Sequence, residues 1–396
     1  MPSHNPFPPL RPQELTRAAF LRRAAAVGLS ASALPLLAAC GGDDASKAAK
    51  PTGDVKLEDL GAVGGAIQIL TYAGYEGGDV IKPWLKQAGV AQKVTPINNQ
   101  DDVTTKLRSP AGRTADAAQL GVAQVEQYRR LGLAYPIQPE WLSNSAKVDK
   151  YFLDLTMDEN GALTAVPFVW GSLGCNYDPK RMGAIESWQE LADPKLKGRV
   201  AMIDDPVSTV QTGALAVGIR EPSKMTRDQL EQVKEFLVKV KANARTVAAG
   251  YADIGDLIVA GDVWASFQGW NAVEIFAAAK DGVVKTAYPK EGTVGFVDCY
   301  IVPKDADNKR SAVAFIDQML STEMQAYVGN DLGSGLVRLD AASEVKGLGA
   351  EVFDYDNLKE LFETKLVFAL DAPIESSGDI ATHEDWVAAW EDVKAT

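Results

Sequence analysis

The sequence predicts an α/β protein of two lobes, each built around a sheet that is rich in parallel strands. Short apolar runs alternate with helical periods along the chain, a pattern typical of strand–helix–strand units. The chain has 396 residues, whereas a single hydrophobic core stops growing at about 250–300 residues. The folded part is therefore expected to divide into two bodies.

The first 39 residues are expected to be an export signal rather than part of the fold. A basic stretch with Arg17, Arg22 and Arg23 precedes a run of small and apolar residues over 24–39, which ends at Cys40. That order is typical of a secretory signal peptide. A cysteine directly after Leu-Ala-Ala resembles the bacterial lipobox, in which the cysteine is lipidated and becomes the first residue. An ordinary membrane anchor is the alternative, but the run is short for a bilayer span of about 20 residues.

Residues 40–65 are expected to form the lipidated cysteine and a flexible tether, because Gly, Asp, Ala and Lys dominate there and large apolar groups are few. We therefore expect the mature protein on the periplasmic or extracytoplasmic face, anchored to the membrane by lipid on Cys40. The segment 16–22 also resembles a twin-arginine export signal with Ala18 in place of the second arginine, which leaves the export route open.

Ordered structure is expected to begin with a strand over 66–72. A helical segment follows, with Val80, Ile81, Trp84 and Leu85 on one face. Further apolar runs typical of strands lie at 117–122, 162–168, 200–203 and 263–267. In sheets of this kind, ligands bind beyond the carboxyl ends of the strands.

The clearest helix is expected to start at Thr226, which forms a capping-box pair with Gln229. Two further helical periods lie near 312–320 and 386–393. The apolar stripe of the first helix consists of Leu230, Val233, Phe236, Leu237 and Val240.

Composition excludes several functional classes. The formal net charge is −13, so the protein is expected to repel nucleic acid, and a cationic ligand suits it better. Beyond the export signal the chain has one histidine, His383, too few for a zinc site of His and Cys ligands, and no phosphate-binding glycine motif occurs. No metal or cofactor is expected. A hydrolase with a carboxylate pair stays open, because acidic residues are abundant.

Two cysteines remain after Cys40, namely Cys175 and Cys299. In an oxidising compartment an even pair can form a disulfide. The alternative is two small buried thiols, and the sequence does not decide between them.

Four blocks in register resemble the spermidine/putrescine-binding proteins of ABC importers, within the broader class of extracellular solute-binding proteins. They are VPFVWGSLGCNY at 166–177, SWQEL at 187–191 with Asp204-Asp205 after it, AGDV at 260–263 leading to Phe267, and YPKEG at 288–292 followed by FVD at 296–298. Their order and spacing hold from about residue 66 to the C-terminus.

This resemblance implies a type II periplasmic binding fold. Residues 66–170 with 303–345 would form the first lobe, and 171–302 with 346–396 the second. Hinge strands near 172–176 and 296–302 would join them. A ligand would be trapped between the lobes by hinge closure, and the closed form, a monomer, would deliver it to permease subunits in the membrane.

The resemblance also places ligand-binding residues. Asp298 falls in an aromatic-x-Asp pattern that holds a ligand amine, and an Asp in an apolar strand is not expected to be buried without a partner. A structural ion pair or hydrogen bond between the lobes is the alternative. Phe296, Phe267 and Tyr72 fall where the family places aromatics that cover the ligand, with core packing as the alternative for the two phenylalanines.

Four further positions carry weaker expectations. Tyr75 is a loop tyrosine near the same site, and Asp205 matches an acidic position in some members or is an ordinary turn residue. Trp270 would line the site or pack beneath it. Ser208 stands where the family has a second glutamate for amines, so the second amine anchor is uncertain.

The sequence thus predicts the substrate-binding component of an ABC importer, without catalytic activity, for a small cationic amine such as putrescine or spermidine. The alternatives are a receptor of the same fold for an amino-acid derivative or another organic solute, an extracytoplasmic carboxylate hydrolase, and an adhesin or scaffold. Specificity resides in the site residues and not in the fold, so the fold alone does not choose a ligand.

Overall fold

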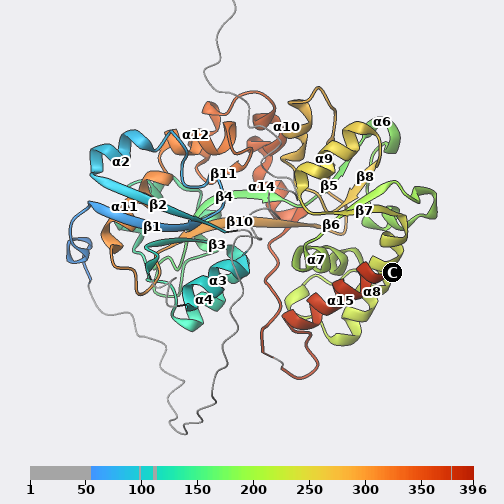
Figure 1. Cartoon of the computed structure of the whole chain (residues 1–396), viewed down its shortest axis with the longest axis horizontal. Coiled ribbons are helices and arrows are strands. Elements are labelled where there is room, and N and C mark those ends of the chain that lie inside the picture. The colour runs from blue at the N-terminus through green and yellow to red at the C-terminus, as the bar shows by residue number, and fades with distance from the viewer. Residues whose placement is uncertain (1–54, 98–99, 110–113, 376) are drawn as a thin grey trace, which may run out of the picture. The chain divides into compact units, whose positions relative to one another are not determined.

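The structure, a computed structural model, describes residues 55–97, 100–109, 114–375 and 377–396. The expected export signal, Cys40 and the first part of the tether lie outside the described residues. Within the described part, strands and helices alternate around two separate sheets, which defines a first and a second lobe (Figure 1). The α/β class with two lobes is confirmed.

The first lobe contains a seven-stranded mixed sheet with the order β11-β4-β10-β3-β1-β2 and with β12 paired to β10. β1 runs parallel to β2 and β3, whereas β10 runs antiparallel to β3 and β4. The strands are β1 (Gly65–Thr71), β2 (Val90–Pro96), β3 (Ala117–Gly121), β4 (Val166–Ser172), β10 (Thr293–Ile301), β11 (Gly335–Leu336) and β12 (Leu366–Val367).

Helices of this lobe include α11 and α12, which follow β10 in the chain (Figure 1). Buried side chains of the sheet and its helices form one continuous core, in which Trp170, Tyr300 and Phe315 are completely buried. The helices are α2 (Lys82–Ala88), α3 (Gln100–Arg108), α4 (Val125–Leu131), α5 (Lys150–Asp154), α11 (Lys309–Met319), α12 (Thr322–Asn330), α13 (Leu348–Phe353) and α14 (Leu358–Glu360).

The second lobe contains a five-stranded sheet with the order β7-β6-β8-β5-β9. β6 is parallel to β7 and β8, and β5 is antiparallel to β8 and β9. The strands are β5 (Cys175–Tyr177), β6 (Val200–Ile203), β7 (Ala244–Ala248), β8 (Ala265–Phe267) and β9 (Lys285–Ala287). The helices are α6 (Pro179–Met182), α7 (Pro206–Ala216), α8 (Arg227–Asn243), α9 (Tyr251–Ala260), α10 (Val273–Ala278) and α15 (His383–Ala395).

Helix α8 shows how closely local sequence sets an element. Thr226 accepts a hydrogen bond from the backbone N–H of Gln229, whose side chain accepts one in return from the Thr226 N–H, so the expected capping box is present. The predicted apolar stripe is buried and packs into the second-lobe core, which also holds Trp386 and Trp390 of α15. The spacing of apolar residues therefore identified both the helix and its buried face.

Among the described residues, the chain passes from one lobe to the other at three places. β4 leads to β5 through residues 173–174, inside the range expected for the first hinge strand. β9 leads to β10 through 288–292, and β12 leads to α15 through 368–382. The second crossing therefore precedes the expected range 296–302, because those residues already belong to β10 and the first sheet.

The predicted lobe boundaries are wrong in two places. Residues 293–301 pair with β3 and β4, so this part of 171–302 belongs to the first lobe. Residues 346–367 also belong there, because Phe353 and Phe362 pack in the first core and β12 pairs with β10. Strand pairing and aromatic contacts distant in sequence decide both assignments, and local patterns do not report them.

Candidate functional site

The carboxylate of Asp298, on the central strand β10, is unusual because it is buried. Asp298 lies opposite Gly121 of β3 and Val169 of β4, and only 9% of the residue is exposed. The Tyr75 hydroxyl donates to its Oδ2 over 3.3 Å. Among the described residues no Lys, Arg or His forms an ion pair with it, so the ion pair between lobes that the sequence left open is not formed there.

Burial has a direct electrostatic consequence for this carboxylate. It raises the pKa of Asp298 from its ordinary value of 3.8 to about 7, and the hydrogen bond from Tyr75 opposes that rise only in part. Desolvation penalises the charged form of a buried acid unless a positive partner is supplied. A cation that entered the site would therefore stabilise the ionised form of the Asp298 carboxylate.

Tyr72 and Tyr75 follow β1 and lie beside this carboxylate. Their rings meet edge to face with centroids 5.7 Å apart, and Tyr75 makes a second such contact with Phe168 at 5.5 Å. The hydroxyl of Tyr300, on β10, donates to the backbone carbonyl of Tyr75. The loop is therefore held to the same strand that carries Asp298.

Phe296 and Trp270 bring aromatic surface to the site from both lobes. Phe296 lies two residues before Asp298 and pairs with Gly171 of β4. A Cβ atom on Gly171 would lie 2.4 Å from Cζ of Phe296 and 3.1 Å from Nε1 of Trp270, so glycine is needed for their close approach. Trp270 follows β8 of the second lobe, and both rings join an apolar cluster with Leu173, Leu215 and Val294.

The second lobe adds a polar network. The amide nitrogen of Gln268 donates to Oγ of Ser208 and to the Tyr251 hydroxyl at 2.8 Å, while its Oε1 accepts from Thr209 Oγ1 at 3.0 Å. Ser208 in turn donates to Oδ2 of Asp205 at 2.5 Å. The Tyr251 ring also contacts that of Trp270, with centroids 6.2 Å apart. We call these five hydrogen-bonded residues the Gln268 network.

The structure brings most of the expected site residues together. Asp298, Tyr75 and Tyr72 are in contact in the first lobe, and Phe296 meets Trp270. The network that contains Asp205 and Ser208 reaches Trp270 through Tyr251. Whether these residues bind ligand stays a prediction.

Phe267 lies apart from this group. It is completely buried in the second-lobe core, edge to face with Trp188 at 5.2 Å and Phe236 at 5.9 Å. This placement favours the core-packing alternative. The next residue, Gln268, has a left-handed backbone with φ of 61° and turns its side chain into the polar network instead.

Sequence reasoning missed Gln268 and Tyr251. Gln268 is a completely buried amide at the end of a strand, and a polar residue between an apolar run and Gly269 was the available signal. Tyr251 is the first residue of α9, directly after Gly250. Its position at a helix start was the only sequence signal for it.

The two cysteines are free and buried, so the disulfide that the sequence left open is not formed. Cys175 lies in β5 of the second sheet, whereas Cys299 lies in β10 of the first. Burial raises the pKa of both thiols above the ordinary value.

In the part of the chain that the structure describes, no group of three His, Cys, Asp or Glu side chains is arranged to hold a metal ion. No helix in that part is long and apolar enough to cross a membrane.

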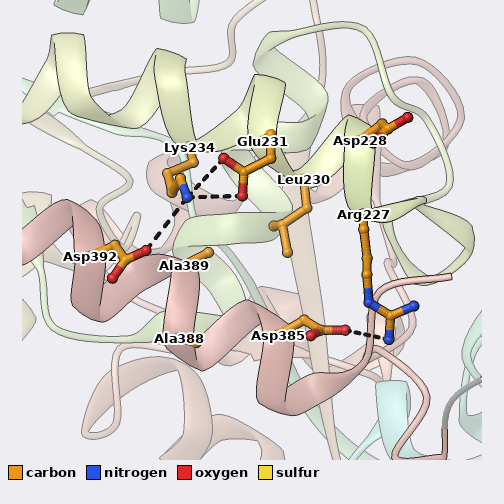
Figure 2. Close-up of a pocket in the computed structure, with 9 residues that line it drawn as sticks. All are labelled: Arg227, Asp228, Leu230, Glu231, Lys234, Asp385, Ala388, Ala389 and Asp392. Carbon is orange, nitrogen blue, oxygen red and sulfur yellow. Dashed lines mark hydrogen bonds and ion pairs between the residues drawn. The ribbon is translucent and has the colours of Figure 1, made fainter. Parts of the chain in front are cut away.

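A surface pocket lies between α8 and α15 (Figure 2). Arg227 pairs there with Asp385 at 3.0 Å, and Lys234 pairs with Glu231 at 2.8 Å and Asp392 at 3.5 Å. These charges neutralise one another at the surface. We therefore interpret the pocket as a solvated contact between two helices, whose ion pairs contribute little to stability. Its lining is completed by Asp228, Leu230, Ala388 and Ala389.

A family model for bacterial extracellular solute-binding proteins matches residues 79–355 of this chain, which is more than half of it. The chain belongs to this family. Its members bind solutes, and the chain is accordingly a binding protein and not an enzyme. The match spans both lobes and includes the strand with Asp298.

Individual solute-binding proteins are similar to this chain over most of their length. The spermidine/putrescine-binding periplasmic protein of Escherichia coli (strain K12) is 24% identical over 259 residues, which cover 64% of this chain and 72% of that protein. The spermidine/putrescine ABC transporter substrate-binding protein PotD of Streptococcus pneumoniae superposes with a TM-score of 0.65 at 18% identity, covering 83% of this chain and 97% of that one. The TpPotD lipoprotein of Treponema pallidum superposes with a TM-score of 0.64 at 18% identity, covering 83% and 99%.

Proposed function

We propose that this solute-binding protein captures a small cationic amine between its lobes and delivers it to the membrane subunits of an ABC importer. One observation carries the proposal. Asp298 is a buried carboxylate that accepts a hydrogen bond from the neutral Tyr75, with no cation paired to it among the described residues. A positively charged ligand would supply the missing partner.

The energetics favour an ammonium group as that partner. A buried charge without a counter-charge is costly, and a charge-assisted hydrogen bond contributes roughly 1.5–3 kcal/mol. An ammonium also restores the ordinary preference of Asp298 for its ionised form, because an opposite charge within a few ångströms lowers a carboxyl pKa.

The aromatic residues suit the rest of such a ligand. Tyr75 is hydrogen-bonded to the carboxylate and its ring contacts that of Tyr72, while the rings of Phe296 and Trp270 approach each other beside Gly171. Rings of this kind cover a methylene chain and attract a cation, each contact contributing about 0.5–2 kcal/mol when desolvated. Relatives named for spermidine and putrescine support polyamines, such as putrescine or spermidine, as the ligand class to test first.

Membrane attachment is part of the proposal. The Leu-Ala-Ala-Cys sequence that ends at Cys40 supports lipidation there, and a protein of the same fold is named a lipoprotein. Lipidation would hold the receptor beside its permease at the periplasmic or extracytoplasmic face, as a monomer.

The test is a binding comparison on the full-length chain. A thermal-shift screen would present putrescine, cadaverine, spermidine, spermine, choline, acidic and basic amino acids, and simple sugars. A ligand at about 100 times its dissociation constant stabilises the native state by about 2.7 kcal/mol, which raises the melting temperature visibly. A shift confined to amines supports the proposal, whereas a shift with sugars or acidic compounds alone contradicts it.

Calorimetry on Asp298→Asn then assigns the anchor. We expect at least a tenfold loss of affinity for the amine, because the substitution removes the counter-charge and keeps the shape. Asp356→Asn, at an exposed position of the first lobe, is the matched control and should bind as the wild type does. Equal affinity of Asp298→Asn and wild type would remove Asp298 from the site.

A further inference from the structure

The Gln268 network has a defined direction of hydrogen bonding. Both amide protons of Gln268 are used, one on Ser208 and one on Tyr251, and its oxygen takes the proton of Thr209. The Ser208 proton goes to Asp205. A primary amide has two donor hydrogens, so the donors of Gln268 are fully used and its orientation is set.

The network is built into the fold. Gln268, Ser208 and Thr209 are all at least nine-tenths buried. Gln268 holds a φ of 61°, a conformation that costs a non-glycine residue about 1–3 kcal/mol and persists where the surroundings enforce it. Such strain at the end of a strand, where ligands bind in these sheets, points to a functional arrangement.

One hydrogen-bond donor beside this arrangement is left without a partner. The Tyr251 hydroxyl accepts from Gln268 and lies within hydrogen-bond reach of Ser208, so it is satisfied inside the network. The buried Nε1 of Trp270, by contrast, has no hydrogen-bond partner among the described residues. A buried donor without an acceptor is unfavourable, so a ligand acceptor at this point would stabilise the bound state.

The Trp270 donor lies next to first-lobe residues of the proposed site. Nε1 of Trp270 would be 3.1 Å from a Cβ on Gly171, beside the Phe296 ring. Phe296 lies two residues before Asp298 on β10. The Tyr251 ring, which is in contact with that of Trp270, ties the indole to the Gln268 network. The Trp270 donor therefore belongs to the same site as Asp298.

We infer that the ligand carries one ammonium group for Asp298 and, away from it, an uncharged oxygen acceptor for Trp270 Nε1–H. A monoacylated diamine has this chemistry, and an amino alcohol is a smaller version of it. The inference rests on the proposed function and names the ligand class within it. It makes Trp270 a specificity-determining residue.

The charges nearby favour an uncharged acceptor over a second charge. A second ammonium would meet the Trp270 donor instead of an acceptor, and two donors facing each other reject a wrong ligand. A ligand carboxylate would be repelled by Asp205, which is linked to Tyr251 through Ser208 and Gln268. Asp205 itself already receives the Ser208 proton and two backbone N–H groups.

The experiment is calorimetry on the full-length chain with four probes of similar length: N-acetylputrescine, putrescine, 4-aminobutyrate and n-pentylamine. We expect N-acetylputrescine to bind at least tenfold more tightly than each of the other three. Trp270→Phe keeps an aromatic ring and removes the N–H, so it should weaken N-acetylputrescine at least fivefold and change n-pentylamine less than twofold. Trp264→Phe, beneath Arg199 in the second lobe, is the matched control and should change neither.

The outcomes separate this inference from the proposed function. Putrescine or 4-aminobutyrate binding as tightly as N-acetylputrescine, or an unchanged N-acetylputrescine affinity in Trp270→Phe, would overturn the inference and leave an amine receptor in place. Failure of every amine to bind would overturn both. The ranking of the four probes on the wild-type chain gives the second readout if Trp270→Phe does not fold.

Discussion

The surroundings of Asp298 differ from those of Asp205, the other carboxylate of the site. It sits on the central strand of a sheet, and the residues opposite it, Gly121 and Val169, offer no charge. Asp205, by comparison, takes hydrogen bonds from Ser208 and from backbone N–H groups. Asp205 is satisfied by hydrogen bonds from its own helix, whereas Asp298 has no charged partner opposite it. The roles of the two aspartates therefore differ.

The raised pKa of Asp298 predicts a specific dependence of stability on pH. The folded state holds a proton on this carboxyl up to a pKa of about 7, whereas the unfolded chain releases it near 3.9. The stabilisation from this proton is complete below about pH 4 and is lost as pH rises to about 7. We expect Asp298→Asn, without ligand, to gain on the order of 3 kcal/mol in unfolding free energy relative to wild type between pH 4 and pH 8.

Urea denaturation of both proteins at several pH values measures this difference, since the titration of all other groups cancels between them. A difference that stays constant from pH 4 to pH 8 would show that Asp298 titrates normally and would weaken its role as an unpaired anchor.

Helix α7 shows how an element positions the site. Its N-cap is Asp205, whose side chain accepts from the backbone N–H groups of Val207 at 3.1 Å and Ser208 at 3.3 Å, and Pro206 occupies the first turn. Proline is tolerated there because its missing N–H would have no partner. The cap fixes where the helix begins and so where Ser208 meets the Gln268 network.

We expect Asp205→Ala to lower the unfolding free energy by about 0.5–2 kcal/mol, the usual cost of losing an N-cap. Asp205→Asn should recover most of it, because asparagine caps about as well as aspartate. Urea denaturation at pH 7 checks both. If the alanine variant matched wild type, the hydrogen bonds at this helix start would contribute nothing measurable.

Strand β10 is the element on which sequence interpretation was least complete. Its residues 296–302 are a hinge strand in the interpretation that the family resemblance implies. The structure makes residues 293–301 a central strand of the first sheet. Pairing with β3 and β4, which lie more than a hundred residues away in the chain, decides this and leaves no local trace.

At the scale of the whole molecule, three crossings join two separately packed cores. At the first of them, a Cβ on Gly174 would lie 2.6 Å from the carbonyl oxygen of Ala287, so the chain passes close to β9 there. Two bodies joined by a few short segments are suited to hinge motion, and a ligand that contacts both lobes favours the closed arrangement.

We expect a bound amine to reduce the radius of gyration of the full-length chain in small-angle scattering. The reduction should be absent in Asp298→Asn at the same amine concentration, because that variant is not saturated. Equal scattering with and without a saturating ligand would mean that the lobes do not move on binding. Control measurements with a sugar should leave the curve unchanged.

The sequence by itself determined the class of fold, the capped helix α8 with its buried face, and the family blocks that pointed to Asp298. Periodicity and caps depend on neighbours within one or two turns, so they can be read directly. Only the tertiary structure decided that Asp298 lacks a cation among the described residues, that Phe267 faces the core while Gln268 faces the site, and that β10 belongs to the first lobe. Burial, charge pairing and strand neighbours arise between segments distant in the chain, and for that reason local sequence does not contain them.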